Sequence, residues 1–383
     1  MNPPLRVFLS AGEASGDRFG ASLVQAIRSR RPDARFLGIG GARMAAQGVE
    51  RIADTTRHAV MGVFSAISKV GYFTGVFRQC VRRFNIEAPS VCVPIDNPGF
   101  NRHLARFAHS RAVPVCYYVS PQFWAWRKGR IYKFAKTVDR VLCILPFEPA
   151  MYEEVGVDAR YTGHPALDYL KQYVEDPAVA ARVRSLGPCV VGLLPGSRLQ
   201  EVRNVFPIIA SAASHIQRRL PQVRFIVGCA EPSHEPLVRA TLRANGVTGA
   251  TLLTGRAWDV MRHARLCVTA SGTATLELAW FRRPMVIVYH APPIARPIMP
   301  WLLRTHFGIV NVIAGREICP EFLMYGPNGA PAGQAAVELL QNEDAWRRQQ
   351  TALGQVVDLL GAPGSADRAA EAVIELAERR RPR

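Results

Sequence analysis

Two short segments contain glycine and small residues where a diphosphate could bind. The first, Pro195-Gly196-Ser197-Arg198, follows the apolar run Cys189–Leu194 and precedes a predicted helix containing Glu201. A tight turn between a strand and a helix presents backbone N–H groups and the positive end of the helix dipole to an anion. Ser197 could cap that helix, and the Arg198 guanidinium adds a fork of donors that suits phosphate. An ordinary capped helix start is the alternative, but Arg198 and a second segment of this kind favour phosphate binding.

The second segment, Ser271–Glu277, also follows an apolar run, Leu266–Thr269. Its small residues allow a ligand to approach the backbone closely, and Glu277 lies one helical turn after Thr273. A carboxylate there could accept both hydroxyls of a ribose, as acidic residues do in dinucleotide sites. The alternative is a solvated glutamate that the helix dipole favours near a helix start. Together the two segments predict a nucleotide diphosphate site.

Two carboxylates follow the first predicted strand, in the segment Ser10–Asp17. This segment resembles a dinucleotide fingerprint only loosely, because the G-x-G-x-x-G spacing is absent. Glu13 and Asp17 could be helix caps. At the carboxyl end of a strand they could equally bind sugar hydroxyls, and both interpretations stay open.

Two further segments combine aromatic rings with cations. Tyr117–Arg127 could stack on sugar faces or line an acyl groove, although an aromatic-rich core is the commoner explanation. Phe64–Phe84 interleaves aromatic and aliphatic residues with Lys and Arg, which suits a helix lying on an anionic membrane. A nucleic-acid interface is the other explanation for the basic residues, but no nucleic-acid-binding motif accompanies them.

The elements that must position these residues alternate between short apolar runs and amphipathic helices. Near-continuous runs of Val, Ile and Leu separated by helices predict parallel sheets buried on both faces. Two such blocks, meeting near residues 163–168, predict an α/β fold with two Rossmann-like domains that face each other across a cleft. The predicted strands are Arg6–Ser10, Arg35–Gly38, Val91–Ile95, Val113–Val119, Arg140–Leu145, Cys189–Leu194, Val223–Gly228, Ala250–Leu253, Leu266–Thr269 and Met285–Tyr289, and the predicted helices include Asp17–Arg30, Glu201–Arg219, Glu235–Asn245 and Asp367–Arg381.

The bulk properties limit the partners and the compartment. The chain has 383 residues and a net charge of +18, which nucleic acid, an anionic membrane or a phosphorylated substrate would each match. Its eight cysteines are scattered with no CxxC pair, which argues against disulfides and zinc and favours a reducing cytosol. The N-terminus lacks the apolar core of a signal peptide. No uncharged apolar run reaches the ~18–20 residues of a transmembrane helix.

Read together, these segments resemble the lipid-A-disaccharide synthase family. The matching segments run in family order from residue 11 to about residue 317, and YVSPxxWAWR and LLPGSRxxEV are specific, whereas SGTATLE also suits other glycosyltransferases of this fold. The segments are AGEASGD (Ala11–Asp17), Met61-Gly62, IDNPGFN (Ile95–Asn101), YYVSPQFWAWRKGR (Tyr117–Arg130), LPFE (Leu145–Glu148), TGHPALD (Thr162–Asp168), LLPGSRLQEV (Leu193–Val202), SGTATLE (Ser271–Glu277) and AGRE (Ala314–Glu317).

The resemblance implies a GT-B architecture and an inverting glycosyltransferase. Residues 166–339 would bind UDP-2,3-diacylglucosamine, and residues 1–165 would bind the acceptor, 2,3-diacylglucosamine 1-phosphate, and face the membrane. The product would be a β-1,6-linked disaccharide, with UDP released. Residues 340–383 would pack on the first domain or exchange in a homodimer. The enzyme would act in the cytoplasm, as a peripheral protein on the cytoplasmic face of the inner membrane, without nucleic acid.

The resemblance also assigns residues to the two substrates. No DxD pair is present to hold a metal, so neither a metal nor another cofactor is expected, and protein groups such as Arg198 would neutralise the departing diphosphate. For the donor the candidates are Gly196, Ser197, Arg198, Glu201, Gly255, Ser271, Gly272, Thr273, Ala274, Glu277, Asn311, Arg316 and Glu317. For the acceptor and the lipid they are Met61, Phe73, Arg78, Arg82, Asn101, Ser120, Trp124, Trp126 and Arg127.

Inversion requires a base for the acceptor hydroxyl, and here the chain departs from the family. Members usually carry a second acid in the IDxPDFN segment and a glutamate after the Met-Gly pair, where this chain has Gly99 and Ser65. Asp96, Glu13 and Asp17 remain candidates for the base. Because both departures lie in the acceptor half, two alternatives stay open: a paralogue with another acceptor, and an inactive membrane-associated binding protein. A third alternative is a UDP-sugar epimerase, which would have the same fold.

Overall fold

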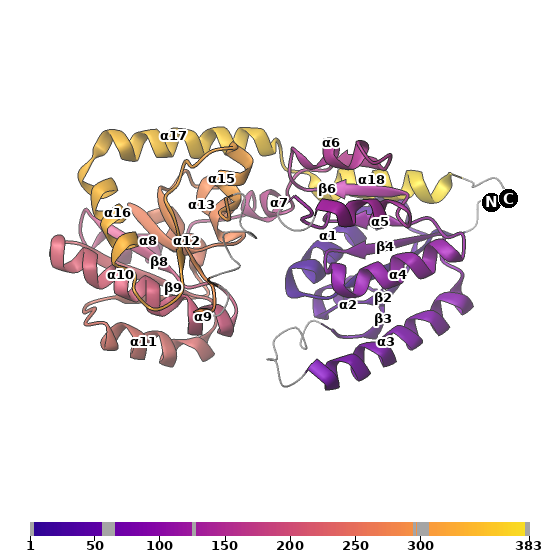
Figure 1. The fold of residues 1–383 in the computed structure, drawn as a ribbon, viewed down its shortest axis with the longest axis horizontal. Helices are drawn as coiled ribbons and strands as arrows, with labels where there is room; N and C mark the ends of the chain where they lie inside the picture. Colours follow the sequence, from indigo (N-terminus) through magenta and orange to yellow (C-terminus); the bar gives the residue numbers. More distant parts are fainter. Residues whose placement is uncertain (1–3, 56–65, 125–127, 294–295, 297–305, 380–383) are drawn as a thin grey trace. The chain divides into compact units, whose positions relative to one another are not determined.

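The computed structural model describes residues 4–55, 66–124, 128–293, 296 and 306–379, which divide into two compact units (Figure 1). Unit 1 contains Met1–Asp168 and Ala362–Arg383, and unit 2 contains Tyr169–Gly361. The expected boundary at residue 165 therefore lies three residues from the observed one. The C-terminal region divides differently from the expectation, because residues 340–361 stay with unit 2 and only the segment from Ala362 returns to unit 1.

Unit 1 is built on a parallel seven-stranded sheet with the order β3-β2-β1-β4-β5-β6-β7. Its central strands are the apolar runs of the sequence, and β4 is buried at every position. The strands are β1 (Arg6–Ala11), β2 (Arg35–Ile39), β3 (Glu50–Ala53), β4 (Val91–Ile95), β5 (Cys116–Tyr118), β6 (Arg140–Cys143) and β7 (Asp158–Tyr161). The helices are α1 (Ala14–Arg30), α2 (Ala42–Ala46), α3 (Ala66–Glu87), α4 (Pro98–Ser110), η3 (Lys128–Arg130), α5 (Ile131–Ala135), α6 (Glu148–Glu153), α7 (Ala166–Leu170, across the boundary) and α18 (Ser365–Glu378).

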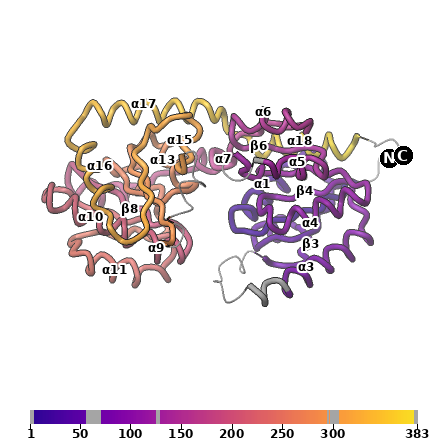
Figure 2. Tube along the Cα trace, viewed as in Figure 1, coloured from indigo at the N-terminus to yellow at the C-terminus, as the bar shows by residue number. Residues whose placement is uncertain are grey.

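The last helix, α18, completes unit 1 although it comes from the far end of the chain. It packs against α1, and Figure 2 shows its yellow trace among the indigo and purple elements of unit 1. The Asp168 carboxylate accepts N–H bonds from the first residues of this segment, including Gly364 at 2.5 Å. The fully buried Arg140 donates to the carbonyl of Ala372 at 2.7 Å and forms an ion pair with Asp158.

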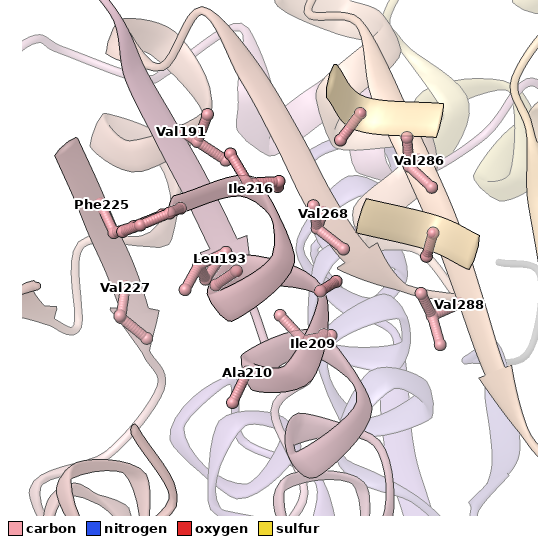
Figure 3. Close-up of a cluster of buried hydrophobic side chains, with 14 of the residues drawn as sticks. Val191, Leu193, Ile209, Ala210, Ile216, Phe225, Val227, Val268, Val286 and Val288 are labelled. Carbon is pink, nitrogen blue, oxygen red and sulfur yellow. The ribbon is translucent and has the colours of Figure 1, made fainter. Parts of the chain in front are cut away.

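Unit 2 has a six-stranded parallel sheet with the order β10-β9-β8-β11-β12-β13. Valine and leucine side chains of β8, β11 and β12 pack against Ile209 and Ile216 of α10 (Figure 3). The strands are β8 (Val190–Leu194), β9 (Arg224–Cys229), β10 (Thr251–Thr254), β11 (Leu266–Ala270), β12 (Met285–His290) and β13 (Glu321–Met324). The helices are α8 (Pro177–Arg184), α9 (Leu199–Asn204), α10 (Phe206–Arg219), η4 (Pro232–His234), α11 (Glu235–Ala244), α12 (Ala257–His263), α13 (Ala274–Trp280), α15 (Ile309–Ala314), α16 (Ala330–Gln341) and α17 (Glu343–Leu360).

The helix predicted over Glu201–Arg219 is two helices, and this part of the prediction is wrong. α9 ends at Asn204, and α10 begins at Phe206 with Pro207 in its first turn. Proline has no N–H to donate and its ring clashes with the preceding turn, so a helix can begin but not continue through it. The break separates the short helix beside Arg198 from the long helix that packs on the sheet.

Among the described residues, no helix is long and apolar enough to span a membrane. All eight cysteines are free, and all except the partly exposed Cys189 are buried. Burial raises the pKa of Cys80, Cys116 and Cys267 to about 12, so these thiols are neutral at physiological pH.

Candidate active site

The acidic residues of unit 1 lie where its strand order reverses. β1 is paired with β2 on one side and β4 on the other, so the segments after β1 and β4 leave the same edge of the sheet in opposite directions. In open α/β sheets this point is the usual place for a ligand. Glu13 follows β1 and Asp96 follows β4, so the structure brings these two predicted base candidates to one switch point.

Asp96 is held in a sparsely populated backbone conformation, with φ of 50°. The next residue, Asn97, has φ of 45°, and two successive non-glycine residues in this region cost of order 1–3 kcal/mol each. The Asn101 side chain donates to the Asp96 carbonyl at 2.7 Å, and the Tyr117 hydroxyl donates to the same oxygen at 2.7 Å. These contacts fix the loop that carries the Asp96 carboxyl group.

The family motif predicts that Asn101 contacts the acceptor, but its amide is occupied inside the protein. Its Nδ2 also donates to the carbonyls of Ser10 and Ile95, and its Oδ1 accepts from the Ser10 hydroxyl at 2.6 Å. Asn101 is almost fully buried. It therefore ties the end of β1 to the end of β4 and positions Asp96, with both amide atoms bonded inside the protein.

Gly12 shows how closely the two loops approach each other. A Cβ atom at Gly12 would lie 1.8 Å from Nδ2 of Asn97, so no larger residue fits there unless the Asn97 side chain moves. The sequence does not show this contact, because the two residues lie in separate motifs 85 positions apart.

Glu13 and Asp17 have different surroundings. Asp17 is only 5% exposed, and its carboxylate accepts N–H bonds from Gly41 at 2.7 Å and from Arg43 and Met44 at 3.1 Å. It thus satisfies the start of α2, which is the structural alternative considered from the sequence. Glu13 is half-buried at the start of α1, and its side chain makes no capping hydrogen bond.

Unit 2 has its own switch point between β8 and β11, and both predicted diphosphate segments leave the sheet there. Gly196 follows β8 with φ of 98°, and Gly272 follows β11 with φ of 146°. Residues with a side chain rarely adopt either conformation, so the two turns require glycine. Gly255, after β10, also has a positive φ, of 70°.

In the first turn, a carboxylate of the protein occupies the backbone groups expected to bind phosphate. Glu201 accepts from the N–H of Ser197 at 2.9 Å and of Arg198 at 3.2 Å, and it forms an ion pair with the Arg198 guanidinium at 3.1 Å. The N-terminal cap of α9 is Arg198, so the expectation that Ser197 caps it is wrong. The Arg198 side chain is 57% exposed.

The second turn lies near an aromatic cluster that sequence analysis missed. The Tyr169 hydroxyl lies 3.5 Å from the Glu277 carboxylate, and the Tyr169 ring stacks on Trp258, with centroids 5.6 Å apart. Trp258 is four residues beyond β10, three after Gly255. The Ser271 hydroxyl donates to the carbonyl of Phe307 at 2.8 Å, whereas Thr273 is exposed and Ala274 is partly exposed at the start of α13.

The family motif predicts that Asn311 binds the donor, but it is fully buried and its amide is used internally. Its Oδ1 accepts from Ile318 and Cys319, and its Nδ2 donates to the Cys319 carbonyl and to Glu321. It shapes the loop that carries the exposed Arg316 and Glu317, which border a groove of about 700 Å³ beside α17.

One group of side chains in the described part of the chain could hold a metal ion. Ligand atoms of His306, Glu317 and Glu321 lie within 4.8 Å of one another. The Glu321 carboxylate is already bonded to His306 at 2.8 Å, to the Gly308 N–H at 2.8 Å and to Asn311 at 3.1 Å. These bonds give Glu321 a structural role without an ion.

The aromatic-rich segment Tyr117–Arg127 divides into a buried part and a half-exposed part. Tyr117 and Tyr118 are fully buried, and Phe123 packs against Phe134, as the aromatic-core interpretation predicts. Ser120 is buried too. Trp124 is partly exposed, whereas Trp126 and Arg127 lie outside the described residues.

The segment Phe64–Phe84, which interleaves aromatic and basic residues, falls largely in α3. The structure describes the side chains of α3 from Gly71 onward. Arg78 and Arg82 are exposed. Phe73 and Phe77 instead pack edge-on or tilted against Phe100 of α4. Phe73 thus contributes mainly to the packing of α3 on α4. Met61 and Ser65 lie outside the described residues.

Comparison with known proteins identifies the family. A family model described as lipid-A-disaccharide synthetase matches residues 7–375. The chain belongs to the lipid-A-disaccharide synthase family. A lipid-A-disaccharide synthase of Myxococcus xanthus is 37% identical over 387 residues, which cover 98% of each chain. The family, the enzyme class of glycosyltransferase and the link to lipid A biosynthesis predicted from the sequence motifs are thereby confirmed.

Solved structures confirm the GT-B fold class at low sequence identity. A glycosyltransferase from Rickettsia africae superposes with a TM-score of 0.60 at 10% identity, covering 99% of this chain and 100% of the other. A UDP-GlcNAc 2-epimerase from Neisseria meningitidis also has a TM-score of 0.60 at 10% identity, covering 97% and 98%. The fold is therefore common to glycosyltransferases and epimerases, and the sequence separates this lipid-A-disaccharide synthase family member from the epimerases.

Proposed function

We propose that this chain transfers 2,3-diacylglucosamine from its UDP conjugate to 2,3-diacylglucosamine 1-phosphate. The reaction would form a β-1,6 linkage with inversion and release UDP. The observation that carries this proposal is the match to lipid-A-disaccharide synthases over residues 7–375. The positions of Asp96, Arg198 and Glu277 beside the switch points of the two sheets support it.

On the donor side, Arg198 would neutralise the UDP diphosphate. Its ion pair with Glu201 is solvent-exposed, and such pairs contribute only about 0–1 kcal/mol. A diphosphate could therefore replace the Glu201 carboxylate at the Ser197 and Arg198 N–H groups at little cost. Glu277 would accept the ribose hydroxyls, and its neighbour Tyr169 would orient it. Ser271, Gly272, Thr273, Ala274 and Gly255 would allow the nucleotide to approach the backbone, and Arg316 and Glu317 would contact the donor from the loop after α15.

On the acceptor side, Asp96 is our first candidate for the general base and Glu13 the second. Asp96 lies at the switch point on a backbone that Asn101 and Tyr117 hold in a strained conformation, and such strain is concentrated at functional sites. Asp17 is the weakest candidate, because three backbone N–H groups already occupy its carboxylate. Catalysis would thus proceed without an acid at Gly99.

The net charge supports docking of unit 1 on an anionic membrane. Residues 55–138 contain thirteen lysines and arginines but only two acidic residues, and so carry +11 of the net charge of +18. Arg78 and Arg82 of α3, Arg102 and Arg106 of α4, and Lys133 beyond them are exposed. Each cation near an anionic surface contributes about 1 kcal/mol. We propose a peripheral protein at the cytoplasmic face of the inner membrane, without nucleic acid or metal, and an exchange of the C-terminal segment between two copies as one arrangement of a homodimer.

A turnover assay tests the proposed reaction. UDP-2,3-diacylglucosamine and 2,3-diacylglucosamine 1-phosphate are supplied in mixed micelles, and the disaccharide and UDP are quantified for the wild type and Arg198→Ala. We expect the wild type to form disaccharide and Arg198→Ala to lose both turnover and tight UDP binding. Tight UDP binding by the wild type with no disaccharide would overturn the proposal.

The same assay addresses the alternatives that Gly99 and Ser65 raise. A paralogue with a different lipid or sugar acceptor would bind the UDP-sugar and turn over only when offered that acceptor. An inactive membrane-associated binding protein would bind UDP and turn over with none. Measuring UDP binding and turnover separately therefore distinguishes the three.

A further inference from the structure

Glu148 is a buried carboxyl group that the proposed mechanism does not use. It is only 1% exposed at the first position of α6, directly after the segment that leaves β6. Its Oε2 accepts from the N–H groups of Ile144 at 3.2 Å and Leu145 at 3.0 Å. Its Oε1 accepts from the indole Nε1–H of Trp124 at 3.2 Å. One carboxyl group thus joins the end of β6 to the aromatic segment after β5.

Trp124 is held from two directions. The indole N–H is bonded to Glu148, and the ring packs edge-on against Phe147, with centroids 5.5 Å apart. The segment that leads to it begins with Val119 at φ of 63°, a conformation that a β-branched residue rarely adopts. Trp124 nevertheless remains partly exposed, so its ring can contact a ligand while its polar edge faces the protein.

The groups that surround Glu148 do not titrate near neutral pH. Burial raises the pKa of Cys143 on β6 and of Tyr152 on α6, and it raises the pKa of Tyr161 on β7 to about 12. Within the described ranges, the main influences on the pKa of Glu148 are its burial and uncharged donors. The Ser120 hydroxyl lies near enough to lower the pKa of Glu148 somewhat, although its geometry falls short of a hydrogen bond. Desolvation outweighs these donors and raises the pKa of Glu148 to about 7.

We propose that Glu148 is a positioning residue that fixes the Trp124 ring through its indole N–H, and that acceptor binding depends on this bond. The first part rests on the contacts of unit 1 alone. The second part rests on the proposed function and on the expectation from the family motif that Trp124 contacts the acylated acceptor.

The bond depends on the charge of the carboxyl group. The ionised group accepts at both oxygens, whereas the hydroxyl oxygen of a protonated carboxyl group donates its own hydrogen and accepts only weakly. Oε2 accepts two backbone N–H groups and Oε1 only the indole, so protonation at Oε1 breaks the fewest bonds. The bond that anchors Trp124 is therefore strong above about pH 7 and weakened below it. Glu148→Gln imitates the weakened state at every pH, because an amide nitrogen that faces the indole cannot accept its hydrogen.

The anchoring is tested first without any substrate. Tryptophan fluorescence is recorded from about pH 5.5 to 8.5, spanning the pKa of Glu148, for the wild type, Glu148→Gln, Trp124→Phe and Glu153→Gln. The last variant makes the same chemical change at an exposed position of the same helix. We expect the wild-type minus Trp124→Phe signal to change with a midpoint near pH 7, Glu153→Gln to behave like the wild type, and Glu148→Gln to show no transition. A transition that survives in Glu148→Gln, or its absence from the wild type, overturns the anchoring.

The link to the acceptor is tested by steady-state kinetics on the same proteins. Trp124→Phe keeps a ring but removes the N–H, and it leaves the buried charge of Glu148 in place. We expect the KM for 2,3-diacylglucosamine 1-phosphate at about pH 8 to rise about tenfold in Trp124→Phe and Glu148→Gln, the change expected on losing one hydrogen bond to a charged group. In the wild type the same KM should rise as the pH falls below about 7, and the Kd for UDP should stay constant in all four proteins.

The outcomes separate this inference from the proposed function. The positioning role is overturned if the acceptor KM in Glu148→Gln equals that of the wild type. It is also overturned if Glu148→Gln loses affinity for UDP as well as for the acceptor. A wild type that forms no disaccharide but shows the fluorescence transition contradicts the proposed function and leaves the anchoring supported.

Discussion

Asp17 and Asp96 follow neighbouring strands of one sheet, yet their carboxyl groups are placed for different tasks. Asp17 accepts three backbone N–H groups and closes the start of α2. Asp96 contributes its backbone carbonyl to the contacts with Asn101 and Tyr117, and these contacts hold the residue itself at a positive φ. The first arrangement stabilises the fold, and the second fixes the direction in which a carboxyl group leaves the sheet.

Exchanging each acid for its amide should therefore have opposite effects. Asp96→Asn should lower turnover by about 10²–10⁴-fold, the contribution typical of a general base, with unchanged Tm and UDP affinity. Asp17→Asn removes one charged acceptor of backbone N–H groups and should cost about 1–2 kcal/mol of stability, with turnover little changed at a temperature where it is folded. Turnover and thermal unfolding of both variants provide the measurement. If Asp96→Asn keeps its turnover, Asp96 is not the general base, and Glu13 becomes the first candidate.

Sequence patterns provide candidate site residues but could not show which of their polar groups are already hydrogen-bonded inside the protein. Asn101 and Asn311 are both expected at the substrates, and both are buried with every amide atom bonded inside the protein. A side chain that holds two loops together has the same sequence signature as one that binds a ligand. Only the three-dimensional contacts, such as Ser10 with Asn101 across 91 positions, separate the two cases.

At the scale of single elements, the turn after β8 combines a required glycine with a carboxylate. A Cβ atom on Gly196 would lie 2.4 Å from Oε2 of Glu201, at a φ of 98°. Gly187 provides a matched control, because its φ of 117° is also unfavourable but a Cβ added there would meet no atom of a more distant residue within 4 Å. The two sites share the backbone strain and differ in the contact with Glu201.

The methyl group of Gly196→Ala would lie where an oxygen must sit to accept from the Ser197 and Arg198 N–H groups, so UDP binding should weaken by about tenfold or more. Gly187→Ala lies outside this turn and should leave UDP binding unchanged. Both should lose about 1–3 kcal/mol of stability from the strained backbone. Calorimetric UDP titration together with thermal unfolding checks this pair. Equal losses of UDP affinity in the two variants would show that the turn after β8 does not bind the diphosphate.

The helix α18 is tied to the sheet by charges whose effect on stability depends on pH. Arg160 and the buried Arg140 contact the Glu375 carboxylate, and their hydrogen bonds and charges lower its pKa to about 2. A lowered carboxyl pKa stabilises the fold above the ordinary glutamate pKa of 4.5, and that stabilisation disappears as the pH falls towards 2. Because Glu375 is 39% exposed, solvent reduces the effect.

Glu375→Gln should lower the Tm at neutral pH and make the Tm less dependent on pH between about 4.5 and 2. Glu378→Gln on the exposed end of the same helix is the comparison. Scanning calorimetry across this pH range provides the measurement. A wild type and a Glu375→Gln variant with parallel pH profiles would contradict the assignment.

The elements predicted from the sequence are those whose burial leaves a strong pattern. All ten predicted strands are present, and β4 has the predicted bounds. Three strands of the described ranges were missed, β3, β7 and β13, and all are edge strands of four residues with partly exposed side chains. An edge strand is buried on fewer sides and needs no continuous apolar run. The fourth edge strand, β10, was predicted because it keeps two successive leucines, whereas β3, β7 and β13 each contain charged residues.

At the scale of the whole molecule, the uneven charge leads to a test of membrane docking. Replacing Arg78, Arg82 and Arg106 by glutamate should weaken binding to vesicles with anionic lipid by several kcal/mol. Each lost cation costs about 1 kcal/mol, and each new negative charge adds to that loss because the anionic surface repels it. The same change at Arg219 and Arg243, exposed in unit 2, should have little effect. Co-sedimentation at about 50 and 300 mM salt, where screening differs, measures both. Equal losses in the triple and the double variant would contradict docking through unit 1.

The return of the chain to unit 1 has a consequence for its synthesis. Unit 2 is an insertion between Asp168 and Ala362, so the ribosome completes it before α18 has emerged. Until then the Asp168 carboxylate lacks the Gly364 N–H that donates to it. The Arg140 guanidinium likewise lacks its two partners in α18, the Ala372 carbonyl and the Glu375 carboxylate. We therefore expect unit 1 to close only after unit 2 has been synthesised, in contrast to the usual vectorial order in which the N-terminal domain folds first. A chain that ends at Gly361 and has been released from the ribosome should already protect unit 2 from protease while unit 1 remains open to cleavage.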